Sequence, residues 1–112
     1  MHELAVAQSM MAVVMENAAA NNAKKITRIE LVVGKLAGVV PDALRFCFET
    51  LKEETIAKDA ALIIHEVAAT AHCATCNLER EVGLYDYFCP TCEGPVFPKG
   101  GDELNVKDIE IE

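Results

Sequence analysis

Four of the five cysteines in this chain form two pairs, Cys73-Ala-Thr-Cys76 and Cys89-Pro-Thr-Cys92, separated by twelve residues. Each C-x2-C pair presents two thiols from one tight turn, and two such turns can enclose a metal ion in a tetrahedron of sulfur. Two disulfides or a redox site are the alternative interpretations, but a single redox pair does not require a second, matching pair. We therefore predict a structural zinc site at Cys73, Cys76, Cys89 and Cys92.

The start of the chain, Met1-His2-Glu3, holds a second group of candidate ligands. The α-amine, the amide nitrogens that follow it and the imidazole of His2 can all reach one metal ion, and Glu3 adds a carboxylate. Four nitrogens in a plane are a ligand set that Ni²⁺ and Cu²⁺ prefer. The same residues also suit an ordinary helix start with an acidic first turn. The residue types alone leave both interpretations open.

Composition excludes several classes of function. The net charge is −8, which argues against nucleic acid or an anionic membrane as the partner, because both require basic patches. No apolar run reaches the roughly 18 residues of a membrane span, and the acidic start does not resemble a secretory signal. Thiols without a secretory signal predict a reducing, cytoplasmic location.

The elements that position these residues follow from hydrophobic periodicity. Residues 4–20 predict a helix, which the pair Asn21-Asn22 ends. The second face of this helix is only weakly polar, which predicts burial on more than one side. A second helix is expected from Pro41 to about Ala57, with Thr55 on its apolar stripe.

Three strands complete the main domain. Residues 26–33 alternate as a half-buried strand does, whereas residues 61–67 are more continuously apolar and predict a central strand. Residues 103–112 predict a third strand whose alternation changes parity, so we expect a bulge near Lys107-Asp108. The predicted fold is α/β (α+β): a small mixed three-stranded sheet with two helices, formed by residues 1–69 and 101–112. A four-cysteine, zinc-ribbon-like module, residues 70–100, is inserted between two of its strands.

The whole chain resembles the HypA/HybF family of nickel chaperones for [NiFe]-hydrogenase maturation. The resemblance rests on Met1-His2-Glu3, on Gln8-Ser9, on the two cysteine pairs and on the C-terminal Gly101-Asp-Glu-Leu104 with its alternating Ile and Glu, all in the family's order. One difference is that neither cysteine pair is followed by histidine, since Asn77 and Glu93 stand there. Any exchange of zinc ligands that requires such a histidine is therefore not expected in this chain.

The resemblance implies Ni²⁺ as a transported metal at Met1, His2 and Glu3, and structural Zn²⁺ at the four cysteines. It also implies docking to a HypB-type GTPase and to the hydrogenase large subunit, and to urease maturation factors in members that serve urease. A homodimer is left open. The expected function is a non-enzymatic metallochaperone that delivers nickel from its N-terminus. The alternative is a zinc-ribbon interaction or regulatory module that transfers no metal.

Overall fold

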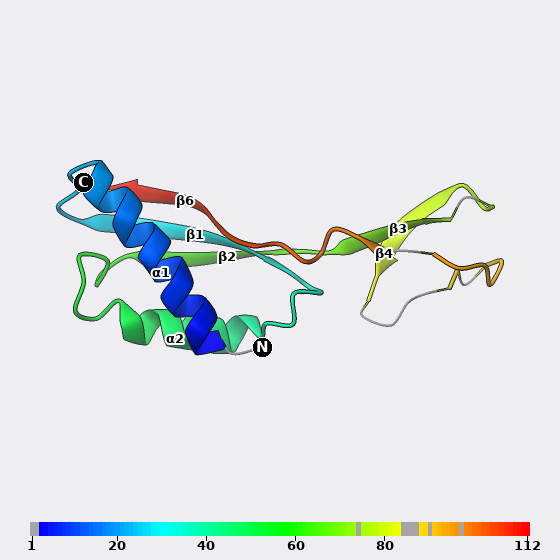
Figure 1. The fold of residues 1–112 in the computed structure, drawn as a ribbon, viewed down its shortest axis with the longest axis horizontal. Helices are drawn as coiled ribbons and strands as arrows, with labels where there is room; N and C mark the ends of the chain where they lie inside the picture. Colours follow the sequence, from blue (N-terminus) through cyan, green and yellow to red (C-terminus); the bar gives the residue numbers. More distant parts are fainter. Residues whose placement is uncertain (1–2, 74, 84–87, 90, 97) are drawn as a thin grey trace.

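The computed structural model describes residues 3–73, 75–83, 88–89, 91–96 and 98–112. The molecule measures 56 × 24 × 17 Å, and its radius of gyration of 17.5 Å exceeds the value of about 13 Å expected for a compact chain of this length. Two small sheets placed end to end account for this elongation (Figure 1). The elements in chain order are α1 (Glu3–Ala20), β1 (Ile26–Gly34), α2 (Pro41–Leu51), β2 (Ala61–Val67), β3 (Ala69–Cys73), β4 (Leu78–Val82), β5 (Pro98–Lys99) and β6 (Leu104–Ile111).

The larger sheet has the strand order β2-β1-β6, with β1 parallel to β2 and antiparallel to β6. The predicted mixed three-stranded sheet is therefore confirmed, but the prediction that residues 61–67 form its central strand is wrong. The central strand is β1, which fully buries Ile29 and Leu31, whereas Ile63 of β2 is 37% exposed. On β2 the Leu62 carbonyl oxygen accepts a hydrogen bond from the Arg45 side chain, at 2.7 Å from Nη1.

Both helices pack on one face of this sheet, and α1 crosses the strands diagonally (Figure 1). The core between the layers consists of buried apolar side chains from α1, β1, α2, β2 and the segment between α2 and β2: Ala7, Met10, Met11, Val14, Ala18, Ile26, Ile29, Leu31, Val33, Leu44, Phe48, Ala57, Ala60 and Leu62. The opposite face of the sheet carries charged side chains, and there His65 Nε2 lies 2.8 Å from Glu30 Oε1. Because β1 and β2 are neighbours, Glu30 on β1 is a structural partner for His65 on β2.

Helix α1 ends where the sequence predicts. Asn22 adopts a positive φ of 53°, and the Ala23 N–H donates to the Ala18 carbonyl at 2.9 Å, which is the bonding of a left-handed helix C-cap. The prediction that α1 is buried on more than one side is wrong for the single chain. Its core face is buried, but Leu4 is 50% and Val13 46% exposed, because α2 and one face of the sheet cover only part of its circumference.

Helix α2 is shorter than predicted and ends at Leu51 rather than near Ala57. The Thr55 hydroxyl donates to the Lys52 carbonyl at 2.8 Å, and the Ala57 N–H donates to that hydroxyl at 3.0 Å. These bonds offer the backbone an alternative to the helical pattern, as threonine side chains often do. The chain then turns back toward β2.

The predicted irregularity in the last strand is confirmed. Asp108 pairs with Glu30 and Val106 with Leu31, so Lys107 is the extra residue of a β-bulge. The bulge brings Leu104, Val106, Ile109 and Ile111 to the same, helix-facing side of the sheet, where all four pack against the core.

A tight junction connects the two sheets. The Gly34 N–H donates to the Glu103 carbonyl and the Leu36 N–H to the Gly101 carbonyl, both at 2.6 Å. A Cβ on Gly34 would lie 2.6 Å from the Asp102 amide nitrogen and closer still to the Gly101 carbonyl. Glycine at position 34 therefore allows the end of β1 to touch the segment that returns from the smaller sheet.

The smaller sheet has the order β4-β3-β5, with both pairings antiparallel. Its core is separate from that of the main domain. Among the described residues it consists of Ala71, Cys73, Cys89 and Val96, with Cys76 and Val82 packed at its edge. A segment of fewer than about 40 residues usually needs a metal or a covalent cross-link to fold, so the cysteine cluster is the natural source of its stability.

Candidate metal centre

The four paired cysteines converge at the end of the smaller sheet. Their Sγ atoms all lie within 4.8 Å of one another, with Cys73 and Cys92 at 3.5 Å and Cys76 and Cys89 at 3.9 Å. A tetrahedral ion with sulfur ligands at about 2.3 Å places its ligands about 3.8 Å apart along each edge. The measured separations fit such an ion, and they are far longer than the roughly 2.05 Å of a disulfide.

Two turns of the same form position these thiols. In each turn the residue after the second cysteine has a positive φ, 53° at Asn77 and 60° at Glu93, and donates its N–H to the carbonyl of the first cysteine. In the second turn the positive φ falls at Glu93 rather than at the neighbouring Gly94. Gly94 has another role, because a Cβ there would lie 3.3 Å from Cys92 Sγ.

Backbone amides prepare the sulfur atoms for ligation. The Cys76 N–H donates to Cys73 Sγ at 3.5 Å, and the Gly94 N–H donates to Cys92 Sγ at 3.4 Å. Hydrogen bonding from the Cys76 backbone lowers the pKa of Cys73, and bonding from the Cys92 backbone lowers the pKa of Cys89 to about 6. Hydrogen bonds between thiols, first that with Cys92, raise the pKa of Cys76 to about 12. The thiols therefore differ in how readily they lose a proton. A divalent cation would stabilise all four thiolates together.

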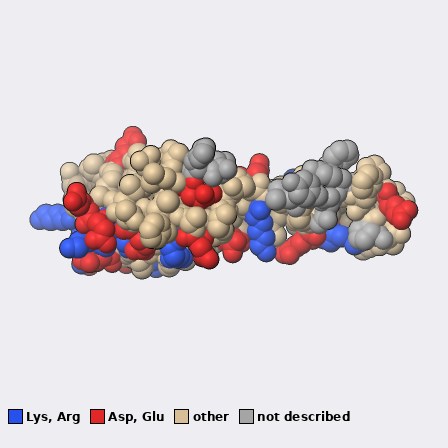
Figure 2. Space-filling model, turned by 90° about the horizontal axis from the view of Figure 1, so that it is seen from below, with Lys and Arg blue, Asp and Glu red and all other residues tan. Residues whose placement is uncertain are grey.

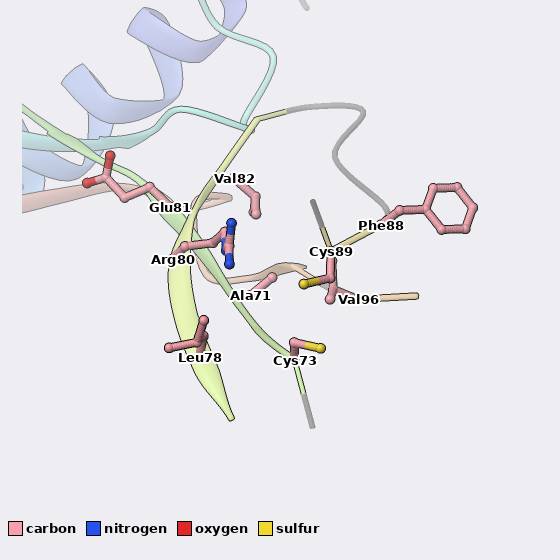
Figure 3. Close-up of a pocket in the computed structure, with 9 residues that line it drawn as sticks. All are labelled: Ala71, Cys73, Leu78, Arg80, Glu81, Val82, Phe88, Cys89 and Val96. Atoms are coloured by element: carbon pink, nitrogen blue, oxygen red, sulfur yellow. The ribbon is translucent and has the colours of Figure 1, made fainter. Parts of the chain in front are cut away.

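A cavity of about 210 Å³ lies beside the cluster, between β4 and the second cysteine turn (Figure 3). Leu78, Arg80 and Val82 of β4 line one side of it, while Phe88 points away and is 66% exposed. Pockets that hold small-molecule ligands are usually larger, roughly 300–1,000 Å³. We therefore assign no cofactor to this cavity.

The candidate residues at the chain start are only partly visible. Met1 and His2 lie outside the described residues, as does Pro90 of the second cysteine turn. Glu3 opens α1, and its Oε2 atom accepts a hydrogen bond from the Val40 N–H at 3.3 Å. Val40 is the N-cap of α2 and has no side-chain cap, so the Glu3 carboxylate lies at the start of both helices.

Two features of this region escaped the sequence interpretation. The contact of Glu3 with Val40 joins residues far apart in the chain, and no local pattern could reveal it. The positive φ at Asn77 was within reach, because asparagine tolerates that conformation better than most residues and it follows the cysteine pair directly. The fifth cysteine, Cys47, packs half-buried against the main core and lies apart from the cluster.

Comparisons with known proteins agree with this architecture. Residues 1–111 match the family model described as "Hydrogenase/urease nickel incorporation, metallochaperone, hypA". The chain is 38% identical to "Hydrogenase maturation factor HypA" from Geotalea uraniireducens over 113 residues, with both chains covered in full. It is also 38% identical to the protein of the same name from Chlorobium limicola, over the whole of this chain and 97% of that one.

A solved structure shows the same fold. The solution structure of the Ni metallochaperone HypA from Helicobacter pylori superposes with a TM-score of 0.69 at 30% sequence identity. The match covers 99% of this chain and 97% of that one. Sequence, cysteine geometry and fold therefore lead to one assignment: the chain belongs to the HypA family of metallochaperones for nickel incorporation in hydrogenase maturation.

Proposed function

We propose that this protein binds Ni²⁺ at Met1, His2 and Glu3 and delivers it to the large subunit of a [NiFe] hydrogenase. The observation that carries the proposal is the family match over residues 1–111, which includes the Met-His-Glu start. The α-amine, the amides of residues 2 and 3 and the imidazole supply the four nitrogens that suit square-planar nickel.

The position of α1 favours such a site. The helix begins at Glu3, and the first amides of a helix have no carbonyl partner within it. Nickel could take these amides in deprotonated form without breaking a helical hydrogen bond, and the resulting negative charge would lie at the positive end of the helix dipole. The Glu3 carboxylate is available as well, because its 3.3 Å bond to Val40 is at the long end of the hydrogen-bond range.

We infer that Zn²⁺ is the ion held by Cys73, Cys76, Cys89 and Cys92, in a module of residues 70–100, with residues 1–69 and 101–112 forming the nickel-binding domain. The sulfur separations of 3.5 and 3.9 Å support tetrahedral thiolate coordination. The length of the module supports a structural role, because segments of fewer than about 40 residues usually need a metal or cross-link, and the bound metal then supplies much of the folding free energy. Four cysteine ligands leave no position for a reactive water, so the role is binding and transfer rather than catalysis.

The proposed partners are a HypB-type GTPase, the hydrogenase large subunit and, where urease is present, urease maturation factors. The proposed location is the cytoplasm. Asp and Glu side chains extend along the whole face seen in Figure 2, with Lys and Arg in small separate groups, which disfavours nucleic acid as a partner. No helix in the described part of the chain is long and apolar enough to cross a membrane.

Nickel titration of zinc-loaded protein tests the proposal. Protein with its native start should take up one further equivalent of Ni²⁺, measured by visible absorption and by metal analysis after desalting. His2→Ala should abolish that equivalent and leave the zinc content at one per chain. His65→Ala is the matched control, since it removes an imidazole that already has a partner in Glu30. Equal nickel uptake by all three proteins would contradict the proposed ligands, and no uptake by any of them would favour the interaction-module alternative.

A further inference from the structure

A groove runs along the outer side of α1, between that helix and the edge strand β6. Three cavities of about 270, 290 and 380 Å³ follow one another along it. Ser9 and Met10 line both the first and the second cavity, and Val13 and Val106 line both the second and the third, so the three are continuous. The groove extends from Ala5 to Asn21 along the chain.

The groove is apolar in its first two cavities and mixed in the third, where Asn17, Asn21, Lys107 and Asp108 join the apolar lining, and it is incompletely covered. Leu104 and Ile109 face the helix layer from β6 but are only half-buried, whereas Leu31 on the neighbouring strand is 0% exposed. The diagonal course of α1 explains the difference, because the helix crosses the sheet and diverges from β6 toward its own N-terminus (Figure 1). Val13 borders the groove and is 46% exposed. Exposed apolar surface of this kind, continuous over several side chains, is typical of a binding surface.

The charges around the groove are acidic. Helix α1 contains Glu3 and Glu16 but no lysine or arginine. On β6 the charged residues that line the groove are Lys107 and Asp108, whereas Glu110 lies on the opposite face of the sheet and pairs with Arg28. Asp102 and Glu103 precede the strand, so acidic side chains outnumber basic ones near the groove. A second copy of this chain would bring two acidic rims together, which costs free energy, whereas a basic partner complements them.

The edge of β6 favours a helix over an added strand as the occupant. The bulge at Lys107 interrupts regular pairing, and Asp108 Oδ1 accepts the Ile109 N–H at 2.9 Å. Bulges and charged side chains of this kind protect sheet edges from strand addition. The stretch from Ala5 to the end of α1 at Ala20 is about 23 Å long, which a partner helix of about 16 residues would match.

We propose that the groove between α1 and β6 binds an amphipathic helix of a partner protein, with an apolar face against Val13, Leu104 and Val106 and with Lys or Arg on its flanks. Such a helix would end near Ala5, two residues from Glu3, and so beside the proposed nickel site. That last link rests on the proposed function, but the binding itself does not. The test below uses no nickel, so failure of one proposal can be told apart from failure of the other.

The probe is a synthetic 16-residue acetylated, amidated peptide with leucine on one helical face and lysine elsewhere, and with a fluorophore at one end. It is titrated with the zinc-loaded full chain in 150 mM salt and followed by anisotropy, and an otherwise identical leucine–glutamate peptide serves as the charge control. Amide shifts of the unmodified ¹⁵N-labelled protein show where the peptide binds. We expect saturable binding of the lysine peptide alone, with shifts concentrated at residues 5–17 and 104–109.

Val13→Glu should weaken this binding at least tenfold, and Ala12→Glu should change it less than twofold. Both substitutions add one negative charge at neighbouring exposed positions, but Ala12 does not line the groove. Val13→Ser adds no charge and should also weaken binding. It keeps the test valid if Val13→Glu fails to fold. Equal or stronger binding by Val13→Glu, shifts confined to the open face of the sheet, or a dimer of the free chain that Val13→Glu dissociates would each overturn the proposal.

Discussion

Replacing Gly34 with alanine should destabilise the main domain at the junction between the two sheets. Gly34 ends β1 with a backbone conformation that alanine can adopt, since its φ is not positive. The damage must therefore come from the new Cβ, which would lie 2.6 Å from the Asp102 amide nitrogen and closer to the Gly101 carbonyl. Both obstacles are backbone atoms, so no side-chain rotation can relieve them.

The size of the effect can be worked from the contacts. Overpacking of this kind costs about 1–3 kcal/mol. Moving residues 101–103 away also weakens the bonds from Gly34 to Glu103 and from Leu36 to Gly101, each with a net value of about 1 kcal/mol. Alanine also lowers the conformational entropy of the unfolded chain, which offsets about 0.4–1 kcal/mol of this loss of stability. The expected net loss is about 3 kcal/mol, a large part of the roughly 5–15 kcal/mol that stabilises a typical domain.

Gly100→Ala is the matched control. Its φ of +74° gives alanine a strain of about 1–2 kcal/mol, but the nearest atom to the new Cβ is Glu103 Oε2 at an ordinary 3.7 Å. Urea unfolding of zinc-loaded protein, followed by far-UV circular dichroism, measures both variants, and zinc content confirms that the cysteine module is intact. A loss below 1 kcal/mol for Gly34→Ala, or an equal loss for both variants, would refute the proposed close contact between β1 and the returning segment.

Three further predictions follow from particular side chains. Cys92→Ser should lower zinc content from one to near zero per chain and disorder the module in amide spectra, whereas Cys47→Ser, outside the cluster, should leave zinc bound. The hydrogen bond from His65 is the main cause that lowers the pKa of Glu30 below 4.5. Its contribution to stability is therefore present above the unfolded-state pKa and is lost as pH falls through the lower folded-state value. A carboxyl-carbon NMR titration should show an upward shift of that pKa in His65→Ala, and an unchanged value would contradict the assignment. Phe48→Ala should cost about 3–5 kcal/mol in urea unfolding, because Phe48 is 0% exposed, and a cost under 1 kcal/mol would place it outside the core.

Local patterns of residues predicted much of this fold. The bulge in β6 could be read from the change of parity between Val106 and Ile109, because side-chain direction alternates strictly along a strand. The end of α1 at Asn21-Asn22 depends on the conformational preference of asparagine, which is a property of single residues. The cysteine cluster could be predicted because two C-x2-C turns bring their own ligands together.

Features that depend on distant contacts could not be predicted. The central position of β1 results from pairing with both β2 and β6, and the apolar run in residues 61–67 suggested otherwise. The end of helix α2 at Leu51 has instead a local cause, because Thr55 bonds to the Lys52 backbone although its spacing fitted the helical stripe. The burial of α1 on more than one side was wrongly predicted from its weakly polar second face, because α2 and one face of the sheet cover only part of the helix.

The central claim, nickel held by the chain start itself, is tested most directly by moving the amine. A Gly-Ser extension before Met1 keeps every side chain but places an amide where the amine was. Nickel titration of zinc-loaded native and extended proteins, watched by visible absorption, should show a square-planar species for the native start only. Affinity should rise steeply with pH, because an amine with an unperturbed pKa of about 7.7–8.0 and an imidazole near 6.5 must both lose protons to bind. The same affinity and spectrum in the extended protein would show that the amine is not a ligand and would contradict this site.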